Sequence, residues 1–198
     1  MDFIMPCWKK IKYFLALLLI MCAFPAVADN IRAIKAEGVK LPNGTVSVET
    51  LFYTTLPEQL QDALKQGVPL QFDLTYQLTR PSLMAYKFRF NRLFANDNVI
   101  SYRLTYHALT ERYRVSTGTF YTEYQNLNSA LKALGATSNW QTLPEGTLKN
   151  NLASDDIGMS VRLSLTTRQL PKPFQINALT SDDWNLDSGW VQLKITWS

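Results

Sequence analysis

The sequence predicts a mainly β fold, namely a single-domain antiparallel β-sandwich of the immunoglobulin-like or Greek-key type with two short helices. Apolar and polar residues alternate through most of the chain after residue 29, which is the period of half-buried strands. Turn signals such as Pro42-Asn43-Gly44 separate some of these segments. No linker rich in Pro, Gly or Ser divides the 198 residues, and 46% of them are hydrophobic, enough for one core. A partly open barrel is the alternative arrangement of the same strands.

The clearest strand spans residues 70–78, where Leu70, Phe72 and Leu74 alternate with polar residues. The same criterion predicts other strands, some of them short, on both sides of it. In chain order they are residues 31–37, 46–53, 86–94, 102–108, 111–115, 139–143, 157–167 and 191–197. The segment Leu170-Pro171-Lys172-Pro173 cannot continue a central strand, so we expect an extended edge or a crossover there.

Two short helices are predicted between the strands. The first begins where Thr55 and Glu58 have the spacing of a capping box, with Pro57 in the first turn, and it stops at Gly67. One face of this helix carries Leu60, Ala63 and Leu64. The second helix carries Leu127, Ala130, Leu131 and Leu134 and stops at Gly135. Apolar residues at helical spacing indicate that both helices pack against a sheet.

The first 28 residues are typical of a cleaved signal peptide. Three lysines precede an apolar run at residues 13–24, and Ala26 and Ala28 fit the cleavage site of signal peptidase. We therefore expect Sec-type export to the periplasm, cleavage after Ala28, and a single β-rich domain at residues 29–198 with no membrane span. Both cysteines, Cys7 and Cys22, lie in the removed segment, so the exported domain would have no thiol and no disulfide. An uncleaved anchor and a lipoprotein modified at Cys22 are the alternatives.

The side chains of the predicted domain carry no recognisable catalytic motif. His107 is the only histidine, which excludes a metal site with two histidine ligands from one chain. There is no Gly-x-Ser-x-Gly motif and no glycine-rich phosphate loop, and His107 lies in a strand-like run, so we interpret it as a polar-face strand residue. The sequence thus predicts a protein that is not an enzyme, with no catalytic residue, cofactor or metal.

Two acidic patterns are interpreted as polar turns. Asp183-x-Asn185-x-Asp187 begins like a calcium loop, but Ser188 replaces the expected glycine and Lys194 replaces the closing acid. The pairs Asp155-Asp156 and Asp182-Asp183 are adjacent in sequence, so an extended chain would point the two carboxylates of each pair to opposite sides. A hydrolase would instead need carboxylates that converge across a cleft.

Residues 80–114 are strongly basic and form the most distinctive feature of the sequence. Because aromatic and aliphatic residues alternate with the cations, the cations of neighbouring strands would share the outer face of a sheet. The candidate partner-binding face consists of Lys87, Arg89, Arg103, His107, Arg112 and Arg114. We expect it to dock an anionic envelope component or an acidic protein rather than nucleic acid, since the aromatics would point into the core. A solvated face paired with distributed acids is the alternative.

Several segments together resemble an uncharacterised exported family of Gram-negative bacteria, domain of unknown function 4390. They are Leu56-Pro57 to Ala63-Leu64, Gly67-Val68-Pro69-Leu70, Tyr106-His107-Ala108-Leu109, Arg112-Tyr113, Ala130-Leu131, Trp140, Val161-Arg162-Leu163, Leu170-Pro171-Lys172-Pro173, Trp184 and Trp197. The resemblance covers nearly the whole predicted domain. It implies a small secreted protein, often encoded beside a membrane sensor kinase, and supplies no catalytic residues.

These observations favour a periplasmic binding or interaction module without catalytic activity, accessory to an envelope sensor kinase system. One alternative is a carrier of a small apolar ligand, held in a cavity between the sheets. The other is an uncharacterised hydrolase. The sequence contains no pattern that identifies the partner or the oligomeric state.

Overall fold

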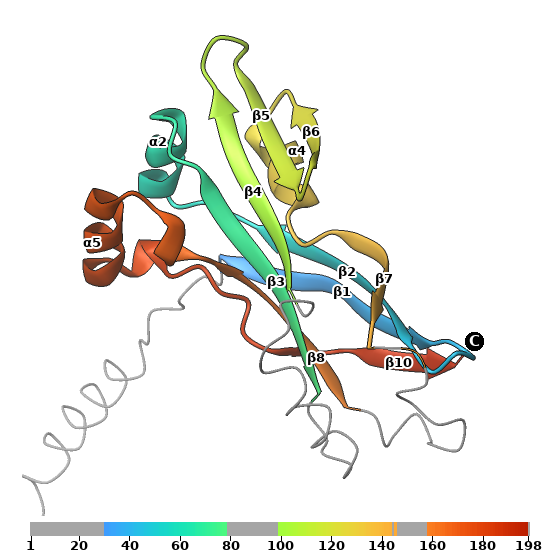
Figure 1. Ribbon diagram of the computed structural model, residues 1–198. Helices are drawn as coiled ribbons and strands as arrows, with labels where there is room; N and C mark the ends of the chain where they lie inside the picture. The colour runs from blue at the N-terminus through green and yellow to red at the C-terminus, as the bar shows by residue number, and fades with distance from the viewer. Residues whose placement is uncertain (1–29, 79–98, 144, 146–157, 198) are drawn as a thin grey trace, which may run out of the picture.

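Two β-sheets pack face to face in the computed structural model, which describes residues 30–78, 99–143, 145 and 158–197 (Figure 1). The four-stranded sheet has the order β10 (Lys194–Trp197), β1 (Ile31–Lys40), β2 (Val46–Thr54) and β7 (Thr137–Thr142). The six-stranded sheet has the order β6 (Phe120–Tyr124), β5 (Arg112–Thr117), β4 (Val99–His107), β3 (Leu70–Leu78), β8 (Met159–Leu165) and β9 (Val191–Gln192). The predicted mainly β sandwich is confirmed. The strand predicted at residues 86–94 lies outside the described residues.

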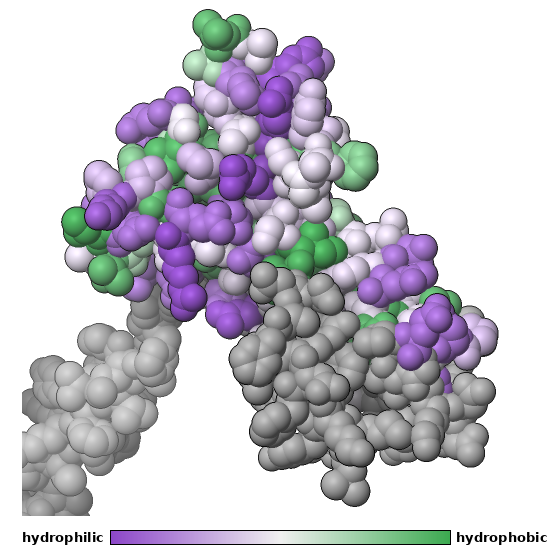
Figure 2. All heavy atoms as spheres, in the orientation of Figure 1, coloured by the Kyte–Doolittle hydropathy of each residue, from purple (hydrophilic) through white to green (hydrophobic). Residues whose placement is uncertain are grey.

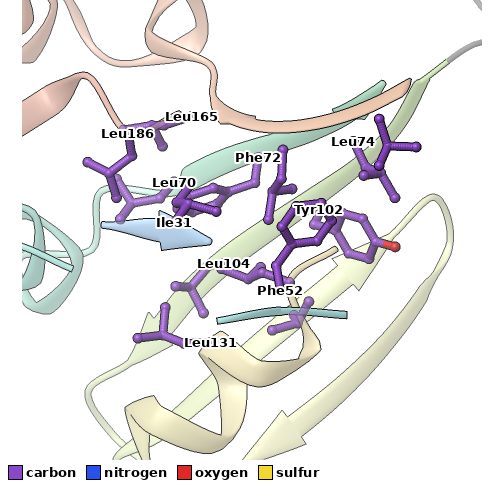
Figure 3. Close-up of a cluster of buried hydrophobic side chains, with 14 of the residues drawn as sticks. Ile31, Phe52, Leu70, Phe72, Leu74, Tyr102, Leu104, Leu131, Leu165 and Leu186 are labelled. Atoms are coloured by element: carbon purple, nitrogen blue, oxygen red, sulfur yellow. The ribbon is translucent and has the colours of Figure 1, made fainter. Parts of the chain in front are cut away.

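Alternating side chains from both sheets form the core between them (Figure 3). On β3, Leu70, Phe72 and Leu74 are fully buried, and on β2 the inward side chains include Val48 and Phe52. Each such side chain contributes about 1.5–3 kcal/mol when it is removed from water. The same alternation leaves the polar residues of β3 and β4 on the outer face of the six-stranded sheet, where the candidate site lies.

Residues 191–197 form two strands instead of the predicted one. β9 pairs with β8 in the six-stranded sheet, whereas β10 pairs with β1 in the four-stranded sheet. Between them Leu193 is buried, and its backbone N–H donates to the Met159 carbonyl at 2.8 Å. The chain therefore crosses from one sheet to the other at Leu193. β10 runs parallel to β1, so this pair is the exception among the otherwise antiparallel strand pairs described.

The strand β6 is an element that the sequence reasoning missed. It forms a hairpin with β5, and its closing pair is Thr117 and Phe120. Gly118 adopts a φ of +58° between them, which matches the first central residue of a type II′ turn. The sequence signal for this hairpin was therefore Thr-Gly-Thr, which lies between two runs of β-forming residues.

Both predicted helices are present as α2 (Glu58–Lys65) and α4 (Leu127–Ala133). The capping box is wrong, because Pro57 is the N-cap of α2 and no side chain caps that helix. Thr55 instead donates its hydroxyl to the Asn30 carbonyl at 3.3 Å, which ties the start of α2 to the start of β1. In α4, the side chain of Asn126 caps the helix by accepting from the Ser129 N–H at 2.8 Å.

A third helix, α5 (Lys172–Thr180), replaces the extended segment predicted at Leu170-Pro171-Lys172-Pro173. Proline is tolerated in the first turn of a helix because the N–H groups there have no partner within the helix. Pro171 is the N-cap, and its carbonyl accepts from the N–H groups of Phe174 and Gln175. The short 3-10 helices η3 (Thr167–Gln169) and η4 (Asp182–Trp184) flank α5. None of the described helices is long and apolar enough to cross a membrane.

Tyr102 makes the stability of the fold sensitive to alkaline pH. Burial raises the pKa of its phenol from 10.0 to about 12, and the hydroxyl donates to the Ala136 carbonyl at 3.2 Å. The folded protein thus holds this proton more tightly than the unfolded chain. The contribution of Tyr102 is complete below pH 10.0 and is lost as the pH rises to about 12.

We therefore expect the free energy of unfolding to fall across this alkaline range, and to fall less steeply in Tyr102→Phe. Urea unfolding at a series of alkaline pH values measures both slopes. Equal slopes for the two proteins would show that another group controls the alkaline transition.

Candidate functional site

The outer faces of β4 and β5 carry the described residues of the predicted basic face. The register places His107 opposite Arg112, Thr105 opposite Arg114 and Arg103 opposite Ser116. Tyr102, Leu104 and Val115, which alternate with them, are buried on the inner side. The structure thus brings Arg103, His107, Arg112 and Arg114 together on one face of two adjacent strands. Lys87 and Arg89 lie outside the described residues.

Arg114 makes an ion pair and a ring contact within the protein. Its guanidinium binds the Glu123 carboxylate at 2.7 Å and lies 4.2 Å from the centre of the Tyr121 ring. The hydrogen bond from Arg114 lowers the pKa of Glu123, so this pair stays charged. Both partners come from β6, which the sequence reasoning did not recognise. Arg114 therefore anchors the β5–β6 hairpin, and its charge is largely compensated.

Arg103, His107 and Arg112 differ from Arg114 in this respect. None of the ion pairs found among the described residues includes any of the three. Arg103 and Arg112 are exposed, and His107 is half-buried at the end of β4. We call these three residues the hairpin face.

The turn that joins the two strands of the hairpin face has an apolar residue at its tip. Residues 108–111 join β4 to β5, and Leu109 within them is fully exposed. In Figure 1 this turn lies at the top of the molecule, beyond α2 and α4. Figure 2 shows hydrophobic surface at that tip and hydrophilic surface directly below it. An exposed apolar residue beside arginines that have no ion pair within the described part of the chain is a combination that suits contact with a partner.

The charges on the neighbouring strands of the same outer face are already satisfied. Asp73 on β3 accepts from the Ser101 hydroxyl at 2.7 Å and from the Thr166 hydroxyl at 2.5 Å. On β8, Arg162 donates its Nε–H to Asp187 at 2.8 Å and makes a second bond through Nη2. This hydrogen bond from Arg162 is the main cause of the lowered pKa of Asp187. On the described strands of this sheet, Arg103 and Arg112 are thus the exposed arginines without an ion pair, and Arg112 and His107 act on Glu123 only as secondary causes of its lowered pKa.

Arg162 is a basic residue of this face that the sequence reasoning did not select. It lies outside the basic segment in sequence, but β8 pairs with β3 and brings it opposite Thr75. Its guanidinium also lies 5.8 Å from the ring centre of Trp190. The alternation of residues 157–167 fits its outward direction, whereas the pairing of β8 with β3 could not be read from the sequence.

The acidic residues of the calcium-like pattern have other partners. Asp183 accepts from the Gln59 side chain at 2.9 Å, and Asp187 pairs with Arg162. Asp182 and Asp183 form part of η4, while Asp155 and Asp156 lie outside the described residues. Within residues 30–78, 99–143 and 158–197, no three His, Cys, Asp or Glu side chains are placed to hold a metal ion.

The fold and this surface define a mainly β, two-sheet protein with a polar outer sheet face and a basic hairpin. The family model described as "Domain of unknown function (DUF4390)" matches residues 28–194. The chain belongs to this family, which confirms the resemblance to domain of unknown function 4390. No curated protein and no solved structure matches it.

Proposed function

We propose that this protein is an exported binding module of the bacterial envelope, without catalytic activity, that docks an anionic partner on the hairpin face. The proposal rests on a contrast between basic residues that lie on the same sheet. Arg114 and Arg162 have carboxylate partners, whereas Arg103, His107 and Arg112 have none among the described residues. Exposed cations on a rigid sheet attract an anionic partner over a distance and orient it on contact.

The side chains of the hairpin face suit recognition of phosphate or carboxylate groups. An arginine guanidinium donates two parallel hydrogen bonds to such a group and loses less hydration than an ammonium group. Arg103 and Arg112 lie four register pairs apart on neighbouring strands, on the same side of the sheet. A partner with at least two negative groups could therefore engage both arginines, while Leu109 at the tip adds an apolar contact.

The cellular part of the proposal rests on the sequence. Lysines, an apolar run and an Ala-x-Ala site in the first 28 residues support export to the periplasm and cleavage. An accessory role beside an envelope sensor kinase is the extension that the family resemblance supports.

Packing between the sheets favours a surface site over an internal one. Phe52, Phe72 and Leu104 are fully buried between the layers (Figure 3). An added Cβ at Gly135 would lie only 2.8 Å from side-chain carbons of Phe52 and Leu163. A carrier of an apolar ligand needs unoccupied volume in the region that these side chains fill. For this reason we place the binding site on the outer face.

The proposal is tested by measuring how the purified protein binds two classes of anionic material. One arm uses vesicles containing phosphatidylglycerol, with phosphatidylcholine vesicles as the neutral control. The other arm uses envelope proteins captured on the immobilised chain. We expect binding in one arm that weakens as salt is added, because salt screens exposed charges. Absence of salt-sensitive binding in both arms would contradict the proposal.

A further inference from the structure

The strand β6 is an open edge of the six-stranded sheet. Among the described strands it pairs only with β5, and four of its five residues are exposed, including Phe120 and Tyr121. Proline, charged side chains, β-bulges and a short length are the features that protect an exposed edge strand from pairing with another chain. β6 contains neither proline nor lysine, and its register with β5 is regular over its whole length. β6 is five residues long and its one charged side chain, Glu123, is bound to Arg114, so its backbone groups remain available to a further strand.

The hairpin register decides which backbone groups face the open edge. In a two-residue hairpin the closing pair, here Thr117 and Phe120, exchanges hydrogen bonds, and bonded pairs then alternate along the ladder. Phe120, Thr122 and Tyr124 accordingly direct their N–H and C=O groups toward β5. Tyr121 and Glu123 direct theirs toward the open edge.

We propose that the protein forms a two-fold symmetric dimer in which β6 of one copy pairs antiparallel with β6 of a second copy, centred on Thr122. In this register Tyr121 lies opposite Glu123 of the second copy, and Glu123 lies opposite Tyr121 of the second copy. These are the residues whose backbone groups face the edge, so both pairs exchange two hydrogen bonds. Shifting the register by one residue would place residues whose backbone groups face the open edge opposite residues whose backbone groups face β5. That register is therefore excluded.

In this register the side chains of β6 in one copy complement those of β6 in the second copy. Phe120, which is 83% exposed in the single copy, lies opposite Tyr124 of the second copy, and the two-fold axis repeats this aromatic pair. Glu123 faces a tyrosine and keeps its bond to Arg114 on its other side. A shift by two residues toward the C-terminus would place Glu123 opposite the same carboxylate of the second copy. The register centred on Thr122 avoids this repulsion.

The dimer would join the two six-stranded sheets edge to edge. Both hairpin faces would then lie on the outer side of one continuous sheet, because β4 and β5 precede β6 in each half. Two linked sites on one surface bind a repetitive anionic partner more tightly than either site alone. The dimer itself rests on β6 and does not depend on the identity of that partner.

Thr122 provides a charge-exchange test, since the proposed axis places it opposite its own copy. We expect the unmodified protein to sediment as a dimer, and Thr122→Lys and Thr122→Glu each to sediment as a monomer because like charges meet at the axis. Mixing the two variants is expected to restore a dimer that contains one of each, identified by native mass spectrometry. Thr119→Lys, in the exposed turn before β6, is the matched control and should remain a dimer.

Recovery of the mixed dimer also shows that both variants fold, because misfolded chains would not regain a specific pair. Two results would overturn the proposal. One is a monomeric unmodified protein throughout a dilution series. The other is a dimer that persists in Thr122→Lys and Thr122→Glu when each is measured alone.

Discussion

Trp184→Ala lowers the free energy of unfolding by about 3–5 kcal/mol, the range for removing a buried aromatic side chain. Trp184 is only 2% exposed. Its ring lies 5.8 Å from that of Phe174 on α5, and its indole N–H donates to the Gln59 side chain of α2 at 3.1 Å. This side chain therefore joins two helices that are far apart in sequence and that lie at the same end of the sandwich (Figure 1).

Chemical denaturation measures this loss, and two variants serve as controls. Trp184→Phe keeps an aromatic ring but removes the hydrogen bond and part of the buried ring volume, so we expect a loss that is smaller than that of Trp184→Ala. Trp190→Ala removes a tryptophan that is 45% exposed and should cost less than Trp184→Ala. Equal losses at positions 184 and 190 would contradict the role given to Trp184 in the core.

Gly135→Ala is the second change with a large expected effect, a loss of about 2–4 kcal/mol. Gly135 adopts a φ of +70°, where an alanine costs roughly 1 kcal/mol. The new Cβ would also lie 2.8 Å from carbons of Phe52 and Leu163, and overpacking of this kind adds about 1–3 kcal/mol. These contacts bring α4 against both sheets, so the variant probes the packing between layers.

Gly118→Ala is the matched control for this packing effect. Gly118 also has a positive φ, +58°, but nothing lies within 4 Å of an added Cβ there. We expect only the conformational cost, about 1 kcal/mol, at this position. If thermal and urea unfolding give the same loss at both glycines, the tight contact at Gly135 is not a determinant of stability.

Alternation was sufficient to predict the sheets where one face of a strand is buried. In β3 every second residue from Leu70 to Leu74 is buried, and the sequence has the same period. The same pattern predicted the outward direction of Arg103 and Arg112, the two exposed cations of the hairpin face. Directions within a strand are therefore local properties that a sequence can specify.

Most of the features that the sequence reasoning missed depend on contacts between elements that the sequence does not bring together, and the β5–β6 hairpin is the exception. The pattern of residues 191–197 fits one strand, but burial of Leu193 divides it between two sheets. α5 has little amphipathic pattern and packs through Phe174 against Trp184, which the sequence does not place nearby. At the candidate site, the pairing of Arg114 with Glu123 depends on the β5–β6 hairpin, so Arg114 was not distinguished from Arg103 because the local turn signal of that hairpin was overlooked.

The hairpin face is tested most directly by the affinity of three proteins for the bacterial envelope fraction. They are the unmodified protein, Arg103→Glu/Arg112→Glu on the six-stranded sheet, and Arg32→Glu/Lys194→Glu as a control. Arg32 and Lys194 are exposed on the outer face of the other sheet, so the control changes the net charge equally. We expect the first variant to lose affinity by at least about tenfold, since each cation near an anionic surface contributes about 1 kcal/mol, and the control to bind like the unmodified protein. Equal affinities for all three proteins, or equal losses in both variants, would contradict a binding site on the hairpin face.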